Sequence, residues 1–456
     1  MNMKNNQLVY STKNNLLEEE PYKYQLIERD VPNLFREIFP YDEVPKIPFN
    51  YRFISMSMPE EIFITDTTFR DGQQSIEPYT EEQITAIFDY LHRLGGENGM
   101  IRQTEFFVYS RKDQSALYKC LEKNYKFPEI TTWIRAAEKD FSLIKNIGIK
   151  ETGVLLSCSD YHIYNKMHLN RTQAVNLYSK IVSDIIENGL IPRCHLEDIT
   201  RADIYGFVIP LITKLKEIAD AARVPIKFRL CDTLGLGIPF TGATLPRSVP
   251  GIISCLQHFC NIDSENLEWH GHNDFYLGTA NAIAAWLYGA SAVNCSLFGI
   301  GERTGNVPIE SMIMQYAALR GTMNGMHPEI ITEIAEYYQR EIGYPLPHNM
   351  PFVGKDFNVT RAGIHADGML KDEEIYNIFN TEKILNRTPD VAITATSGQA
   401  GIVYWYNQRY PNAEPVKKDS KIVSYIKSWI DCEYENGRQT AISDMEMERL
   451  VENYKK

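Results

Sequence analysis

Residues 61–96 read EIFITDTTFRDGQQSIEPYTEEQITAIFDYLHRLGG, and the architecture of the chain follows from the pattern that they contain. The first six residues form a short apolar run, which predicts a buried β-strand. Residues 81–95 have the apolar spacing of an amphipathic helix. A polar loop joins the two segments. Residues 61–96 therefore predict one β/α unit whose loop follows the carboxyl end of the strand.

The same alternation continues to about residue 325, and most apolar runs precede a plausible helix. Eight such strands predict parallel pairing in an α/β fold, a closed (β/α)8 TIM barrel. A doubly wound sheet is the alternative, but no G-x-G-x-x-G motif follows the first strand. The eight runs are EIFITD (61–66), MIRQTEFFV (100–108), EITTWIR (129–135), ETGVLLS (151–157), LIPRCHLE (190–197), IKFRLCD (226–232), LEWHGH (267–272) and SAVNCSLFG (291–299).

Two further segments flank the predicted barrel domain, which we place at residues 59–325. Residues 1–58 are polar and then punctuated by proline, and we expect an N-terminal extension packed on the barrel or on a partner. Residues 326–456 contain several amphipathic patterns and predict a mainly helical C-terminal subdomain.

Charge and cysteine content exclude several classes of protein. The chain has 47 Lys and Arg against 59 Asp and Glu, and its net charge of −12 argues against nucleic acid or an anionic membrane as the main partner. Its eight cysteines contain no C-x-x-C pair, so neither a disulfide framework nor a thiolate zinc site is expected. The N-terminus lacks the apolar core of a signal peptide, and no segment suits a membrane span. We therefore expect a soluble cytoplasmic protein.

The strongest chemical signal is His270-Gly271-His272, where the seventh predicted strand ends. Side chains two residues apart on a strand point the same way, so both imidazoles can face one point. Asp71, after the first strand, supplies a carboxylate, and Asn306, after the eighth, is a candidate weak oxygen ligand. The carboxyl ends of barrel strands meet at one face. The pattern predicts a divalent metal site open to substrate, and its alternative is a pair of hydrogen-bonding core histidines.

Other polar side chains are expected at the same face. Arg70 offers a planar fork of donors for a carboxylate or a developing oxyanion. Arg193, His195 and Glu197 share one face of the fifth strand, where buried charges must be paired or functional. The alternative for Arg193 and Glu197 is a structural ion pair. Thr233, after the sixth strand, has a hydroxyl that can donate to a carboxylate.

One polar patch lies outside the predicted barrel. It runs from Arg361 to Gly368 and is followed by Tyr376. Its composition predicts a surface loop, and nothing in the residues themselves connects it to a metal.

Four motifs in matching order resemble the DRE-TIM metallolyase superfamily over residues 60–410: DTTFRDGQQ (66–74), HGHND (270–274), GERTGN (301–306) and GIHADG (363–368). Within that superfamily the chain is most similar to the Claisen-type acyltransferases, which comprise isopropylmalate, homocitrate and Re-citrate synthases. Those enzymes join the methyl carbon of acetyl-CoA to a 2-oxo acid and then hydrolyse the thioester. The superfamily's lyases carry a cysteine after the eighth strand, where this chain has Glu302-Arg303-Thr304, which argues against an acyl-CoA lyase.

The resemblance implies roles for the barrel residues. It makes Arg70 the group that polarises the oxo acid and stabilises the enolate, and it places Glu197 at the reacting centre. Thr233 matches a contact to the substrate carboxylate. The implied ion is Mn²⁺ or Co²⁺, with Mg²⁺ or Zn²⁺ as alternatives. The implied ligands are Asp71, His270 and His272, and Asn306 stays a candidate from its position alone.

The resemblance also connects the outer patch to the reaction. His365 matches a histidine that acts as general acid and base from the neighbouring subunit, and Tyr376 has the spacing of a tyrosine that joins it. A homodimer is therefore implied. His195 and Gln74 are further candidates for substrate binding. A metal-binding barrel without catalysis is the non-enzymatic alternative, but such a chain should have lost a ligand, an acid or the arginine, and all are present.

The substrate is suggested by Arg193, which stands four residues before Glu197. Homocitrate synthases have an arginine at this spacing that reaches the second carboxylate of the oxo acid, and isopropylmalate synthases lack it. Three features resemble Re-citrate synthases: the N-terminal extension, Gln73 in RDGQQ and the HLED run at 195–198. The resemblance thus favours oxaloacetate as acceptor, then 2-oxoglutarate, then 2-oxoisovalerate.

Overall fold

The computed structural model describes residues 8–12, 16–19, 22–144 and 147–455. The chain divides into two compact units, Met1–His327 and Pro328–Lys456, and each is described by itself.

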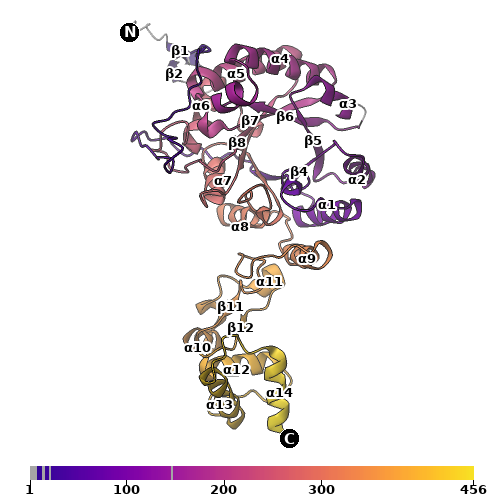
Figure 1. Ribbon diagram of the computed structural model, residues 1–456, viewed down its shortest axis with the longest axis vertical. Coiled ribbons are helices and arrows are strands. Elements are labelled where there is room, and N and C mark those ends of the chain that lie inside the picture. Colours follow the sequence, from indigo (N-terminus) through magenta and orange to yellow (C-terminus); the bar gives the residue numbers. More distant parts are fainter. Residues whose placement is uncertain (1–7, 13–15, 20–21, 145–146, 456) are drawn as a thin grey trace. The chain divides into compact units, whose positions relative to one another are not determined.

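The first unit contains a closed barrel of eight parallel strands in the order β10-β3-β4-β5-β6-β7-β8-β9, with helices around it (Figure 1). The pairing of Cys295 on the last strand with Asp66 on the first closes the ring. The predicted TIM barrel is therefore confirmed. The strands are β3 (Phe63–Asp66), β4 (Ile101–Phe106), β5 (Glu129–Arg135), β6 (Glu151–Ser157), β7 (Ile191–Glu197), β8 (Lys227–Asp232), β9 (Leu267–Gly271) and β10 (Ala292–Cys295).

Local sequence explains where helix α1 starts. In α1, Thr80 and Gln83 form a reciprocal capping box, and Ile84, Phe88 and Leu91 supply the buried face. The barrel helices are α1 (Glu81–Gly95), α2 (Arg111–Glu122), α3 (Phe141–Ile144), α4 (Arg171–Glu187), α5 (Ile209–Ala222), α6 (Val249–Cys260), α7 (Gly278–Leu287) and α8 (Ile309–Arg320).

Successive side chains along a barrel strand point alternately toward the helices and into the barrel, so the first unit has an apolar outer core and a separate inner core. On β7, Cys194 and Leu196 are fully buried and lie on the opposite face from Arg193 and His195. The polar face points into the barrel, because His195 contacts Glu105 on β4. The apolar face therefore packs under the helices, and the barrel interior is charged.

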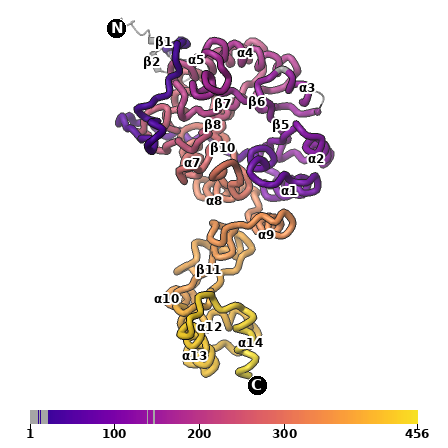
Figure 2. Tube along the Cα trace, in the orientation of Figure 1, coloured from indigo at the N-terminus to yellow at the C-terminus, as the bar shows by residue number. Residues whose placement is uncertain are grey.

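The N-terminal extension begins with the hairpin β1 (Leu8–Ser11) and β2 (Leu16–Glu19) and then runs along the barrel. Its backbone amides donate to barrel carbonyls: Ile27 to Gly206, Asn50 to Gly242 and Ser57 to Leu287, each at 2.9 Å. Figure 2 shows this indigo segment following the side of the barrel. Of the two expectations for the extension, packing on the barrel is the one that the structure shows.

The second unit is mainly helical, as predicted, with one pair of short parallel strands. Its core joins residues from α12, α13 and α14, including Ile402, Val423, Ile426 and Met447. The helices are α9 (Ile330–Tyr337), α10 (Gly363–Lys371), α11 (Thr381–Leu385), α12 (Gly398–Arg409), α13 (Lys421–Glu435) and α14 (Asp444–Lys455), and the strands are β11 (Val359–Thr360) and β12 (Asp390–Val391).

The prediction of a surface loop from Arg361 to Gly368 is wrong, because helix α10 begins at Gly363. Ala366 and Met369, three residues apart, are buried in the core of the second unit. Composition alone missed this helix because its sequence, GIHADGMLK, contains two glycines, which are poor helix formers and typical of loops.

Among the described residues, no helix is long and apolar enough to cross a membrane. All eight cysteines are free thiols, and seven of them are buried.

Candidate active site

Asp71, His270 and His272 meet at the carboxyl end of the barrel strands. One ligand atom from each lies within 4.8 Å of the others. Asp71 Oδ2 is 3.9 Å from His270 Nε2 and 3.6 Å from His272 Nε2. All three are at most 5% exposed. The structure therefore brings together the three ligands that the sequence analysis proposed.

Unpaired polar atoms show that this cluster suits a cation. Asp71 Oδ2, His272 Nδ1 and both amide atoms of Asn306 are buried, with no hydrogen-bond partner in the described structure. Asn306 lies next to His272 through an isolated antiparallel bridge. His270 Nδ1 is 2.7 Å from Asn294 Oδ1, which leaves His270 Nε2 free to face Asp71. The cluster fits a divalent ion bound by nitrogen and oxygen ligands.

Electrostatics keep the ligands in the protonation states that a metal requires. Burial lowers the pKa of His270 and His272, so both imidazoles are neutral at neutral pH. Burial alone would raise the pKa of Asp71, but the Arg70 guanidinium and the two imidazoles together outweigh it and hold that pKa well below its usual range. Asp71 is therefore a carboxylate.

Arg70 links the metal cluster to a charged barrel interior. Its Nη1 donates to Asp71 Oδ1 at 3.0 Å and its Nε donates to Glu105 Oε2 at 2.8 Å. Glu105 also accepts from Arg229 Nη1 at 3.0 Å through both oxygens and from Arg193 Nη2 at 3.3 Å. One fully buried carboxylate thus orients three guanidinium groups, and Arg70 is rigidly aimed.

We expect Glu105→Gln to lower the free energy of unfolding by about 3–5 kcal/mol, because removal of one partner leaves buried charges uncompensated. Glu61→Gln is the matched control, since Glu61 pairs with Arg102 at the surface with 67% of its side chain exposed. Urea unfolding of both variants measures the difference. A loss for Glu105→Gln no larger than that for the control would contradict the central role of Glu105.

Arg193 lies deeper in the barrel than a contact with the second carboxylate of the oxo acid would require. It is 1% exposed and lies 3.3 Å from both Glu105 and Glu151. The structural ion pair considered for it exists, with these carboxylates in place of Glu197. Its contact with a substrate carboxylate stays a prediction. His195 Nε2 is 3.3 Å from Glu105 Oε1, and burial lowers the pKa of His195 to about 3, so it is neutral.

Glu197, at the end of β7, is held by three side chains. Ser157 donates to it, Lys166 Nζ donates at 2.6 Å, and His162 Nδ1 lies 3.1 Å away. Burial raises the pKa of Glu197, but His162 and Lys166 outweigh it and lower the pKa to about 2. Glu197 is therefore a fixed anion and a weak base. Neither His162 nor Lys166 was identified from sequence.

The other proposed contacts are at loop positions. The Thr233 hydroxyl accepts the Asp198 amide hydrogen at 2.8 Å. Gln74 is exposed in the turn after Asp71, whereas Gln73 is buried and donates to the Phe69 carbonyl at 3.1 Å. Gln73 thus supports the turn from within.

Glu310 supports the loop that carries Asn306, because its carboxylate accepts the Phe298 amide hydrogen at 3.1 Å. Burial raises the pKa of Glu310 to about 7, whereas an unfolded Glu titrates at about 4.3. The folded chain retains a proton that the unfolded chain has lost, so this group lowers stability as pH rises from about 4 to 7.

We expect Glu310→Gln to abolish that loss. The free energy of unfolding of the variant, relative to that of the natural chain, should rise by about 2 kcal/mol between pH 5 and pH 8. Urea unfolding at both pH values provides the measurement, with each pH serving as the control for the other. A difference independent of pH would show that Glu310 is already ionised in the folded chain.

His365 and Tyr376 form a pair in the second unit, whereas the metal cluster lies in the first. His365 is on α10, and its ring centroid is 4.3 Å from that of Tyr376. A Cβ at Gly368 would lie 2.5 Å from the Tyr376 ring, so this approach requires glycine. Tyr376 is 42% exposed, and the pair is open to solvent on one side.

The barrel, its metal cluster and the adjoining arginine define a class of proteins: the chain belongs to the HMGL-like family, which its residues 61–337 match. It is 53% identical to the Citrate (Re)-synthase of Clostridium kluyveri over 94% of this chain and 95% of that protein. It is 52% identical to the Citrate (Re)-synthase of Syntrophus aciditrophicus over 95% of this chain and 69% of that protein. The HMG-CoA lyase of Bacillus subtilis has a similar fold, with a TM-score of 0.51 and 18% identity over 64% of this chain and 97% of that one. The family membership expected from the four motifs is confirmed.

Proposed function

We propose that this chain is a metal-dependent acyltransferase that condenses acetyl-CoA with oxaloacetate to give citrate and CoA, the Re-citrate synthase reaction. The observation that carries the proposal is the buried cluster of Asp71, His270 and His272 beside Arg70. The near full-length similarity to two Citrate (Re)-synthases supports oxaloacetate as the acceptor.

Asp71, His270 and His272 would hold the ion, with Asn306 as a further oxygen ligand, and we favour Mn²⁺ or Co²⁺ for this set. A bound divalent ion supplies Lewis-acid polarisation of a ketone oxygen. Arg70 is pre-oriented by Glu105 and presents its guanidinium to negative charge that develops nearby.

Four residues are proposed for binding and orienting the oxo acid, and Glu197 contributes a fixed negative charge beside them. The Thr233 hydroxyl and the neutral His195 ring are suited to hydrogen bonds. The four residues are Arg193, Thr233, His195 and Gln74.

We propose that His365 and Tyr376 transfer protons in this reaction and come from the partner subunit of a homodimer. Their ring contact supports a joint role. Removal of His365 should then be rescued by a subunit that retains it.

We expect Arg70→Ala and His365→Ala to be inactive alone and to regain roughly a quarter of natural activity when subunits are exchanged, because half of the dimers then contain one intact site of two. Partial unfolding, mixing and refolding allow the exchange, and CoA release is the measurement. Two His365 variants mixed together serve as the control. Failure of complementation in demonstrated heterodimers would show that His365 acts within its own subunit.

Release of free CoA thiol from acetyl-CoA tests the proposed reaction. The assay contains Mn²⁺ or Co²⁺, without oxygen, and one acceptor at a time: oxaloacetate, 2-oxoglutarate or 2-oxoisovalerate. Turnover with oxaloacetate alone supports a citrate synthase. Preference for 2-oxoglutarate would make the chain a homocitrate synthase, and turnover with 2-oxoisovalerate an isopropylmalate synthase. Absence of thiol despite bound metal would favour a lyase or a barrel without catalysis.

We propose a cytoplasmic location. Eight unpaired thiols support it, since extracellular compartments oxidise cysteine.

A further inference from the structure

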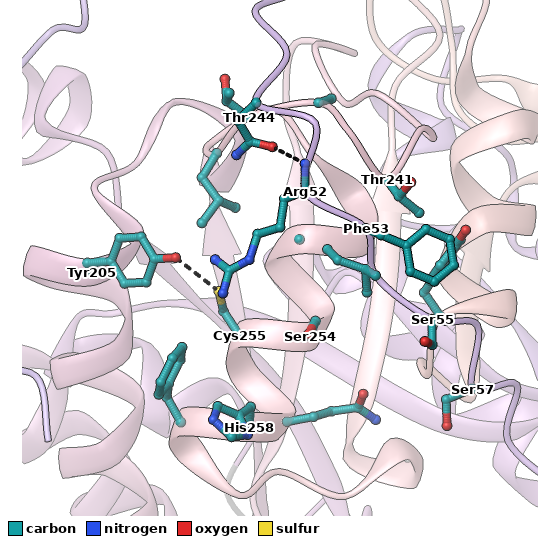
Figure 3. A pocket seen from close by; sticks show the side chains of 18 residues that line it. Arg52, Phe53, Ser55, Ser57, Tyr205, Thr241, Thr244, Ser254, Cys255 and His258 are labelled. Carbon is teal, nitrogen blue, oxygen red and sulfur yellow. Dashed lines mark hydrogen bonds between the residues drawn. The ribbon is translucent and has the colours of Figure 1, made fainter. Parts of the chain in front are cut away.

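A cavity lies on the outside of the barrel, between the extension and helix α6 (Figure 3). Its volume is about 620 Å³, within the range of small-molecule sites. Residues 50–57 form one wall, α6 forms the opposite wall, and residues 241–245 close one end. None of the proposed metal ligands or substrate contacts lines it. The extension therefore creates a space that the barrel alone would not have.

The polar groups of this cavity suit an anion. No carboxylate is present among its 18 lining residues. Arg52 extends from the extension into the space, as Figure 3 shows, and His258 faces it from α6. Thr244 Oγ1 is buried and has no hydrogen-bond partner in the described structure. Because this hydroxyl is already shielded from water, it is available to donate a hydrogen bond to a ligand. The other hydroxyl groups of the lining belong to Ser55, Ser57, Thr241, Ser254, Tyr205 and Tyr288.

Aromatic rings supply the apolar part of the lining. Phe53 comes from the extension, Tyr205 precedes α5, and Phe259 lies on α6. The Tyr205 and Phe259 ring centroids are 6.3 Å apart. Ser254 and His258, four residues apart, share the face of α6 that lines the cavity. These two rings pack edge to face on each other and both contact Tyr24, so the aromatic cluster is closed within itself. The small side chain of Ser254 leaves room for a flat group beside this cluster, on the side of the cavity.

We propose that this cavity binds a nucleotide-like ligand, with a phosphate at Arg52 and a flat ring against the aromatic side chains, at a site separate from that of the condensation. Arg52 offers the planar fork of donors that suits phosphate. Thr244 and Ser254, which line the same cavity, are neutral donors for the rest of the ligand. The site gives the extension a function beyond packing, and it does not depend on which acceptor the enzyme uses.

Isothermal titration of the full chain with AMP tests the proposal, with adenosine and inorganic phosphate as half-ligands. AMP should bind more tightly than either half. Arg52→Ala should weaken AMP binding about tenfold or more, since it removes a charge-assisted contact. Lys46→Ala is the matched control, because it removes one exposed charge from the same extension and should leave binding unchanged.

A second variant, Ser254→Phe, fills the cavity without a change of charge and should abolish AMP binding while CoA release continues. Saturating acetyl-CoA should not displace AMP. The proposal is overturned by AMP binding no tighter than phosphate, by binding insensitive to both substitutions, or by displacement with acetyl-CoA. Unfolding midpoints and CoA release confirm that each variant is folded, so failure of this site is distinguishable from failure of the proposed reaction.

Discussion

Asp71→Asn is expected to abolish metal binding and to lower kcat/KM for CoA release by about 10³-fold or more, since the site loses its anionic ligand. The carboxylate faces both imidazoles at under 4 Å and is the negative charge nearest to them. An amide keeps the shape but not the charge. Two neutral imidazoles and two amide oxygens would then hold the ion far more weakly.

Metal content after dialysis and the shift of the unfolding temperature with added Mn²⁺ provide readouts that do not require activity. Asp89→Asn is the matched control, because Asp89 pairs with Lys123 at the surface of α1. The control should retain metal and turnover. An Asp71→Asn variant with full metal content and full activity would remove this cluster from the mechanism.

The metal cluster was predictable because two simple rules specify it. Alternation along a strand directs His270 and His272 to one side, and the barrel topology brings the loop after β3 to the same end. The same local periodicity predicted the eight strands, although β10 ends at Cys295, earlier than the apolar run. A turn follows there, in which Phe298 has a φ of 57°. Hydrophobicity alone does not encode such a backbone reversal.

The charged interior was not predictable in the same way. Glu105 and Arg229 are 124 residues apart, and neither stands in a motif. Their contact depends on the shear of the closed barrel, which sets the strands that face each other across it. The signal was nevertheless present, since a charged residue inside an otherwise buried run must be paired. The alternation of Gln103 and Glu105 on β4 marks an inward polar face.

Arg193 shows the limit of an argument from spacing. Its distance of four residues from Glu197 places both on the same face, but one full layer of side chains, that of His195, separates them. The structure gives Arg193 carboxylate partners at its own depth, Glu105 and Glu151. Sequence alone specifies the face of a strand and leaves the depth of the partner open.

Arg70→Lys is expected to lower kcat for CoA release by about 10²–10³-fold while metal content is retained. Lysine keeps the positive charge beside Asp71 but has no planar fork. The lysine ammonium group cannot donate to both Asp71 and Glu105 in fixed directions and still present a donor to negative charge that develops on the substrate. Because the loss belongs to the transition state, kcat should fall more than KM rises.

Arg102→Lys is the matched control, because Arg102 bonds Glu61 at the surface and its replacement should leave kcat unchanged. Metal content separates the two large effects: Asp71→Asn loses metal and turnover together, whereas Arg70→Lys loses turnover alone. A kcat within about threefold of the natural value for Arg70→Lys would show that a point charge suffices. The hydrogen bond by which Glu105 orients Arg70 would then stabilise the fold without contributing to the reaction.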